Sequence, residues 1–167
     1  SALFIWCQQR RVITMSLSAM IISSEKLNTE DFKEIILAHG GFVSSGKPFR
    51  GGVSEGNSEI WLALHSKDVL EEFYDAEDLQ GWQDVLGGEP QVMIELNLDH
   101  TEHAKLIYLK VFLSFAEAWP CVLNDVDDSI LSHSSLFPKI SNTAPIRYKD
   151  VDLIFMLFCL FKIKFNN

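Results

Sequence analysis

Apolar and polar residues alternate most regularly over Gln91–Leu98, and this period of two predicts a strand with one buried face. Glu59–His65 alternates in the same way and predicts a second strand. Three shorter apolar segments predict further strands: Met20–Ser23, Phe42–Val43 and Cys121–Leu123. Together these segments supply a sheet against which amphipathic helices can pack.

Three stretches have helical periodicity. The first follows Asn28, whose side chain can cap the free amides, and it ends at Gly40–Gly41. The second covers Asp75–Leu86, with its aspartate as the cap. The third follows Asp99–Glu102, which is typical of a capping box with the aspartate as the cap, and its apolar positions repeat every 3.6 residues up to Pro120.

The stretch 44–58 is rich in Gly, Ser and Pro and predicts a long loop, of the kind that is often functional or mobile. The predicted elements follow in the order strand, helix, strand, strand, helix, strand, helix, strand. We therefore expect an α/β (α+β) fold in which helices pack on one face of a mixed sheet. A ferredoxin-like sandwich or an elaborated relative satisfies this order.

The 167 residues divide into four parts by composition. Residues 19–128 carry the predicted elements and form a single α/β domain, preceded by an N-terminal extension, 1–18. A linker rich in Ser, Asn and Pro, 129–150, leads to an apolar tail, 151–167. The apolar run in that tail is shorter than the roughly 20 residues that span a bilayer. The tail could lie on a membrane, add a strand to the sheet, or result from a change of reading frame, and we expect no membrane insertion.

The cysteines and the N-terminal charges bear on the compartment. Cys7, Cys121 and Cys159 lie far apart and form no close pair, which argues against a disulfide framework or a zinc site. Arg10–Arg11 follow the first apolar run, whereas a secretory signal has its positive residues before that run. These features predict reduced thiols and a cytoplasmic location.

Charge is distributed unevenly along the chain. The net charge is −9, but residues 24–132 carry 21 acidic against 7 basic side chains, hence −14. Between Asp68 and Glu102 there are eleven Asp and Glu residues in thirty-five positions and no Lys or Arg. Such a stretch disfavours direct nucleic-acid binding, because phosphates require cationic side chains. On a folded scaffold it predicts a surface that attracts a basic protein.

The candidate partner-binding residues come from this stretch and from the acidic turn after the last predicted strand. They are Asp68, Glu71, Glu72, Asp75, Glu77, Asp78, Trp82, Asp84, Asp125, Asp127 and Asp128. The ordinary alternative is a solvated helix face with helix caps, but surface helices usually mix charges of both signs. Trp82, Tyr74 and Trp61 would be aromatic anchors if they are exposed, and they could equally belong to the core.

A second hypothesis is a small metal-dependent enzyme, or a regulatory domain that binds a ligand. His100 and His103 stand three positions apart at a helix start, and Asp125–Asp128 could supply oxygen ligands. Against it, the acidic turn lacks the glycine and distal glutamate of an EF-hand loop. Gly51–Gly56 lacks the lysine of a phosphate-binding loop, and no base accompanies Cys121 in the sequence.

With these residues in view, the chain resembles the small acidic immunity proteins of bacterial contact-dependent inhibition and related polymorphic toxin systems. The resemblance rests on the acidic α/β design and on the stretches Val92–Leu98, Ala104–Trp119 and Cys121–Asp125. It implies a protein that is not an enzyme, needs no cofactor or metal, and binds and neutralises a cognate basic toxin such as a nuclease.

Overall fold

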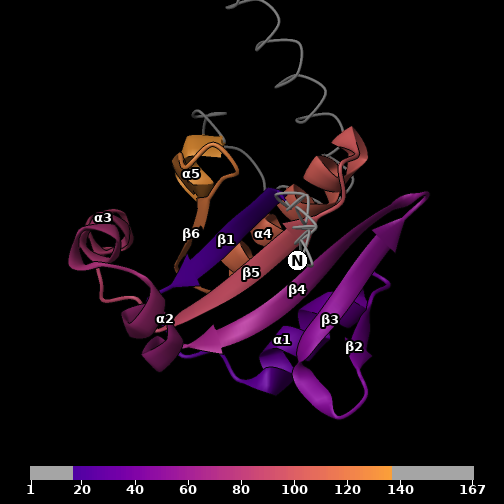
Figure 1. Ribbon diagram of the computed structural model, residues 1–167, viewed down its shortest axis with the longest axis horizontal. Coiled ribbons are helices and arrows are strands. Elements are labelled where there is room, and N and C mark those ends of the chain that lie inside the picture. Colours follow the sequence, from indigo (N-terminus) through magenta and orange to yellow (C-terminus); the bar gives the residue numbers. More distant parts are fainter. Residues whose placement is uncertain (1–16, 137–167) are drawn as a thin grey trace, which may run out of the picture.

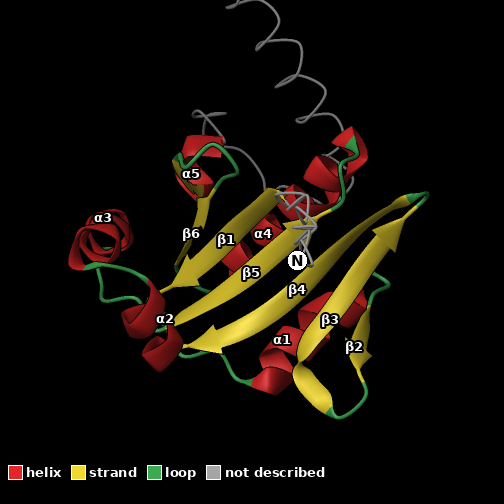
Figure 2. Cartoon of the chain, viewed as in Figure 1, coloured by secondary structure: helices red, strands yellow, loops and turns green. Residues whose placement is uncertain are grey.

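The computed structural model of the chain describes residues 17–136, so the apolar tail, most of the N-terminal extension and most of the predicted linker lie outside the described residues. Helices are interspersed among the strands along this part of the chain (Figures 1 and 2). Their bounds are β1 (Leu17–Ser23), α1 (Thr29–Ala38), β2 (Phe42–Ser44), β3 (Lys47–Glu55), β4 (Ser58–Ser66), α2 (Lys67–Phe73), α3 (Ala76–Leu86), β5 (Val92–Leu98), α4 (Glu102–Ala118), β6 (Cys121–Asn124), β7 (Ile130–Ser132) and α5 (His133–Leu136).

The strands form one sheet in the order β2-β3-β4-β5-β1-β6-β7. Within it, β1-α1-β4-β5-α4-β6 has the connectivity and the sheet order, β6-β1-β5-β4, of a ferredoxin-like core. The β2–β3 pair, the α2–α3 pair and β7 elaborate that core. The predicted α/β (α+β) class is therefore confirmed.

Two details of the prediction were wrong. Every neighbouring pair of strands is antiparallel, so the sheet is not mixed. The reason is that strands running in the same direction are never neighbours: β5 lies between β1 and β4, and β1 lies between β5 and β6. Helices also pack on both faces rather than on one. In Figure 1, α1 and α4 lie behind the sheet, while α2 and α3 lie toward its left end.

The first face of the sheet, which α1 and α4 cover, carries the main core. Helix α4 has its apolar positions over the centre of the sheet, and α1 covers the β3 side. The fully buried large side chains of this layer include Phe32, Ile36, Ile94, Leu96, Tyr108, Phe112 and Phe115. Because successive strand residues point to opposite faces, the alternation in β5 sends Val92, Ile94, Leu96 and Leu98 to this side, as predicted.

The second face carries a smaller apolar cluster. Ile22, Met93 and Val122 alternate with the residues of the main core and point to the opposite side of the sheet. Leu70 of α2 and Trp82 of α3 pack onto them and are buried. The central strands are thus buried on both faces, and the acidic helices are fixed to the second one.

Helix caps agree with the prediction at two of three positions. Asn28 caps α1 through hydrogen bonds of 2.9 Å from the second and third helical amides, and Asp75 caps α3. At α4 the cap is Thr101, which accepts from the amide of Ala104, whereas Asp99 was expected to cap. Asp99 instead accepts from the amide of Glu59 at 2.8 Å and joins the starts of β4 and α4. Both residue types cap helices, so the sequence alone did not decide between them.

The predicted loop 44–58 contains β3 and was therefore wrong. Glycines lower strand propensity, and two of them stand together in this strand. Here they allow close approach: a side chain at Gly51 would put its Cβ 2.4 Å from the carbonyl oxygen of Phe42, and one at Gly52 would reach within 2.9 Å of the Phe42 ring. Helix α2 was also missed, and β7 and α5 lie within the stretch that was predicted to be a linker.

A histidine contact joins the two helices of the first face and gives a pH-dependent prediction. The His39 Nε2 lies 2.8 Å from the Ser114 hydroxyl of α4, and burial together with nearby Lys110 lowers the pKa of His39, although Glu55 opposes the shift. A histidine with a lowered pKa binds fewer protons in the folded state than in the unfolded state, whose pKa is about 6.5. Its contribution to stability is therefore complete above that value and is lost as the pH falls toward the folded pKa.

We expect the free energy of unfolding to fall more between pH 7.5 and pH 5.5 in the natural protein than in His39→Gln, since glutamine does not titrate. Urea unfolding at both pH values measures this difference. Identical losses in the two proteins would show that His39 does not contribute.

Candidate functional site

The exposed carboxylates of α2, α3 and their flanking residues gather on one region, which we call the acidic surface. All of its members are exposed. They are Asp68, Glu71, Glu72, Asp75, Glu77, Asp78, Asp84 and Glu89. Seven of these eight were predicted as partner-binding residues, and Glu89 was noted within the same acidic stretch.

Local sequence explains why these carboxylates point outward. Leu70 and Trp82 are the buried residues of their helices, and they fix which side of α2 and α3 meets the sheet. Asp75 accepts hydrogen bonds of 3.0 Å from the amides of Glu77 and Asp78, so all three carboxylates lie at the positive end of α3. The acidic positions of both helices lie away from this packed side and are exposed.

Few of these charges are neutralised within the described residues. Lys67 forms ion pairs with Glu71 at 3.4 Å and Glu89 at 2.7 Å. The hydrogen bond with Glu89 raises the pKa of Lys67 and lowers that of Glu89. Four others, Asp68, Glu72, Glu77 and Asp78, make no side-chain hydrogen bond or ion pair with any residue in 17–136.

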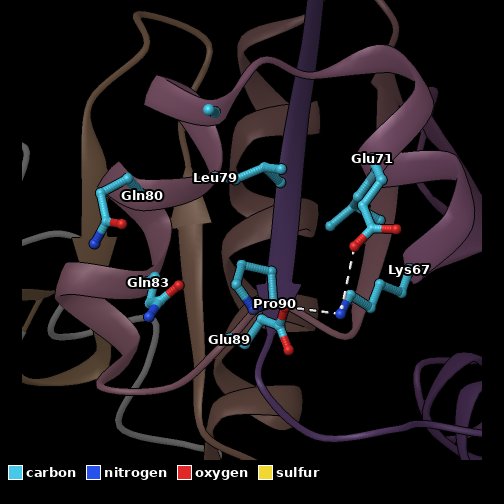
Figure 3. A pocket seen from close by; sticks show the side chains of 9 residues that line it. Lys67, Glu71, Leu79, Gln80, Gln83, Glu89 and Pro90 are labelled. Carbon is cyan, nitrogen blue, oxygen red and sulfur yellow. Dashed lines mark hydrogen bonds and ion pairs between the residues drawn. The ribbon is translucent and has the colours of Figure 1, made fainter.

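A pocket of about 200 Å³ opens within the acidic surface (Figure 3). Apolar residues of α2, α3 and the segment before β5 line part of it, and the Lys67 ammonium lies between Glu71 and Glu89. Gln80 and Gln83 of α3 contribute amides on the other side. The pocket can receive a side chain with an apolar stem and a polar head, a combination found in lysine and arginine.

Trp82 is not part of the exposed surface, which corrects its predicted role. Only 3% of the residue is exposed. Its Nε1 donates a hydrogen bond of 3.2 Å to the Asn124 side-chain oxygen, and its ring meets Tyr74 edge to face with centroids 4.9 Å apart. The apolar spacing of α3 places the ring toward the sheet, so Trp82 is a core residue. Tyr74 is half-buried against it, whereas Trp61 is 49% exposed and lies on β4.

The acidic turn after β6 also differs from the prediction. Asp125 is 6% exposed and accepts hydrogen bonds from the Tyr108 hydroxyl and, at 2.8 Å, from the amide of Val126. Lys105 lies 3.8 Å from its other oxygen. Asp125 therefore stabilises the junction of α4 and β6 and is not available to a partner. Asp127 and Asp128 are exposed in the β6–β7 turn, outside α2 and α3.

Sequence reasoning missed the most exposed aromatic residue of this region. Phe73 ends α2 beside Glu72, and it is 71% exposed. The available signal was the Phe73–Tyr74 pair between acidic residues, because adjacent side chains cannot both point toward the sheet from the end of a helix. Tyr74 takes the inward position, and Phe73 remains in solvent.

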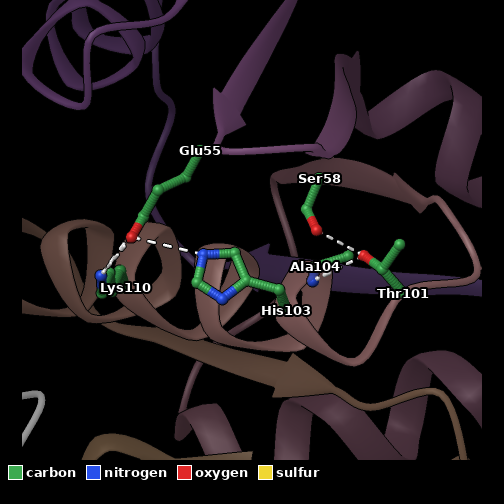
Figure 4. Close-up of polar contacts among 6 residues, drawn as sticks. All are labelled: Glu55, Ser58, Thr101, His103, Ala104 and Lys110. Atoms are coloured by element: carbon green, nitrogen blue, oxygen red, sulfur yellow. Dashed lines mark hydrogen bonds and ion pairs between the residues drawn. The ribbon is translucent and has the colours of Figure 1, made fainter.

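The residues of the metal hypothesis do not converge. His103 lies 3.3 Å from Glu55, which Lys110 also contacts at 3.3 Å, and the nearby Ser58 and Thr101 hydroxyls bond to each other (Figure 4). His100 is exposed, and Asp125 is bound to Tyr108. Within residues 17–136 no group of three or more His, Cys, Asp or Glu side chains is arranged to hold a metal. Burial raises the pKa of Cys121 to about 12, which leaves its thiol protonated.

Comparisons with known proteins add no relative: no protein-family model, curated protein or solved structure matches this chain. None of the helices in 17–136 has the length and apolar character needed to cross a bilayer.

The opposite placements of Trp82 and Phe73 give a stability prediction. Trp82→Ala should lower the free energy of unfolding by about 3–5 kcal/mol, because it removes a buried aromatic side chain. Phe73→Ala should change it by no more than about 0.5 kcal/mol, because the ring is in solvent. Chemical denaturation of both variants measures this. A Phe73 variant as unstable as the Trp82 variant would contradict the assignment.

Proposed function

We propose that the protein is an immunity protein that binds a cognate basic toxin, such as a nuclease, through the acidic surface and thereby neutralises it in the cytoplasm. It acts as a binding protein rather than an enzyme and uses no cofactor. One observation carries the proposal: exposed carboxylates follow α2 and α3 on a rigid support, and four of them have no ion pair or side-chain hydrogen bond within the described residues. The general resemblance to acidic immunity proteins agrees with it.

Electrostatic attraction would bring the two proteins together. A patch of one charge sign steers an oppositely charged partner and can raise the association rate by 10-fold or more. Carboxylates that lack internal partners lose no existing ion pair when they meet lysine or arginine. In a nuclease, the same cationic cleft binds phosphates, so occupying it would exclude the nucleic acid.

Apolar contact would then slow dissociation. Aromatic side chains near the centre of an interface contribute much of the binding free energy, and surrounding charges contribute less. Phe73 is the exposed aromatic residue within the acidic surface, so it takes the anchoring role that was first assigned to Trp82.

The experiment compares three forms of the full chain as bait in the lysate of its source cell. The first is the natural protein, and the second is Glu72→Gln/Glu77→Gln/Asp78→Asn. The third, a matched control, is Glu25→Gln/Glu34→Gln/Glu117→Gln, which removes the same charge from exposed positions outside the acidic surface. We expect the natural protein and the control to retain one basic protein at low salt, and the second variant to lose it.

With the captured protein purified, the association rate should fall by roughly tenfold in the acidic-surface variant and should fall as salt rises, because screening acts over about 8 Å at physiological ionic strength. Phe73→Ala should instead raise the dissociation rate, by about 30-fold if it is a hot spot of about 2 kcal/mol. Stopped-flow or surface-based kinetics separates the two rates. Equal retention by both charge variants, or capture of no basic protein, would contradict the proposal.

A further inference from the structure

Two aromatic rings lie exposed on the second face of the sheet, beyond the part that α2 and α3 cover. Trp61 of β4 is 49% exposed and Phe42 of β2 is 43% exposed. Their rings meet edge to face, with centroids 5.5 Å apart and an interplanar angle of 84°. We call this pair the aromatic platform; it crosses β2, β3 and β4.

The backbone is adapted to hold the platform. Gly52 of β3 is the register partner of both Phe42 and Trp61, so it lies between the two rings. A Cβ at this position would come within 2.9 Å of two ring carbons of Phe42. The missing side chain lets the Phe42 ring lie over the strand and contact Trp61.

Carboxylates border the platform. Glu95 accepts from the Asn97 side-chain nitrogen at 3.0 Å and pairs with His65 Nε2 at 3.0 Å, so its position is fixed, and its side chain is still 37% exposed. Asn97 is the register partner of Trp61 on β5. Glu59 lies two residues before Trp61 and points to the same face. Arg50 also belongs to this face, and its guanidinium carbon lies 5.9 Å from the Phe49 ring centroid.

The platform lies on the same side of the sheet as the acidic surface. On β5, Met93 packs beneath α2 and α3, and Asn97 lies beside Trp61; the two point to the same face. The two residues are four positions apart along the strand, which is roughly 13 Å at 3.3 Å per residue. Tyr74 connects the two regions, because its hydroxyl lies 2.9 Å from the Met20 sulfur on this face. A partner that covers a typical 800 Å² on each side of an interface can reach both.

We propose that the aromatic platform binds an arginine side chain of the basic partner, whose guanidinium stacks on Trp61 while Glu95 and Glu59 accept its hydrogen bonds. This inference rests on the proposed function and adds to it a second contact with the same partner. Charge complementarity selects the ligand: two carboxylates, Glu59 and Glu95, border the platform against the single cation Arg50, and an excess of carboxylates repels phosphates and attracts cations. Arginine fits better than lysine, because its planar guanidinium stacks on aromatic rings and forms paired hydrogen bonds with a carboxylate.

The test uses the isotope-labelled full chain and a short arginine-rich peptide, with the same peptide carrying citrulline as an uncharged control of equal shape. NMR titration follows the Trp61 indole N–H and the Asn97 side-chain amide. Both signals should shift with the arginine peptide, and the citrulline peptide should bind at least about fivefold more weakly. Trp61→Leu and Glu95→Gln should each weaken binding at the platform about fivefold. Leu37→Ala, at an exposed apolar position of α1 on the first face of the sheet, should leave it unchanged.

The outcomes separate this inference from the proposed function. Shifts confined to α2 and α3, with the Trp61 indole unmoved, would overturn the arginine site and would still agree with an acidic surface that binds a basic protein. Equal binding of the citrulline peptide would also overturn it, because charge would then not select the ligand. If Trp61→Leu does not fold, binding by the Glu95→Gln variant tests the arginine site instead. The Glu95 side chain is partly exposed, so this substitution should leave the fold intact.

Discussion

Packing of Leu70 and Trp82 onto the second face of the sheet is the constraint on which the other features depend. Same-sign charges on α2 and α3 repel one another by a few tenths of a kcal/mol per neighbouring pair. Burying a large apolar side chain contributes about 1.5–3 kcal/mol, so two such residues offset several repulsive pairs. The apolar cluster therefore holds in place a concentration of charge that free helices would not maintain.

The two faces of the sheet therefore have different roles. On the first face α1 and α4 form the main core, and their contacts stabilise the fold. On the second face the helices cover the β1 and β6 side, and the aromatic platform remains exposed on β2 and β4. Acidic helices and exposed rings consequently face the same direction. A single basic partner can then combine electrostatic attraction with aromatic contact.

Periodicity was sufficient to predict the central elements, because β5 and α4 are long and have one clearly apolar face. It failed at β3, where Gly51 and Gly52 read as a loop although they allow close packing around Phe42. Exposed acidic side chains of α2 and α3 could be predicted from charge alone. The burial of Trp82 could not be predicted in this way, because it depends on a contact with Asn124, which lies far away in the chain. The burial of Asp125 depends on a contact with Tyr108 across the junction of α4 and β6.

Amide hydrogen exchange on the full chain, alone and saturated with the captured basic protein, would test the central claim most directly, because it reports which backbone segments the partner covers. The account predicts added protection in α2, α3 and the Trp61 segment of β4, with little change in α1. Protection confined to α1 and α4, with α2 and α3 unchanged, would contradict it.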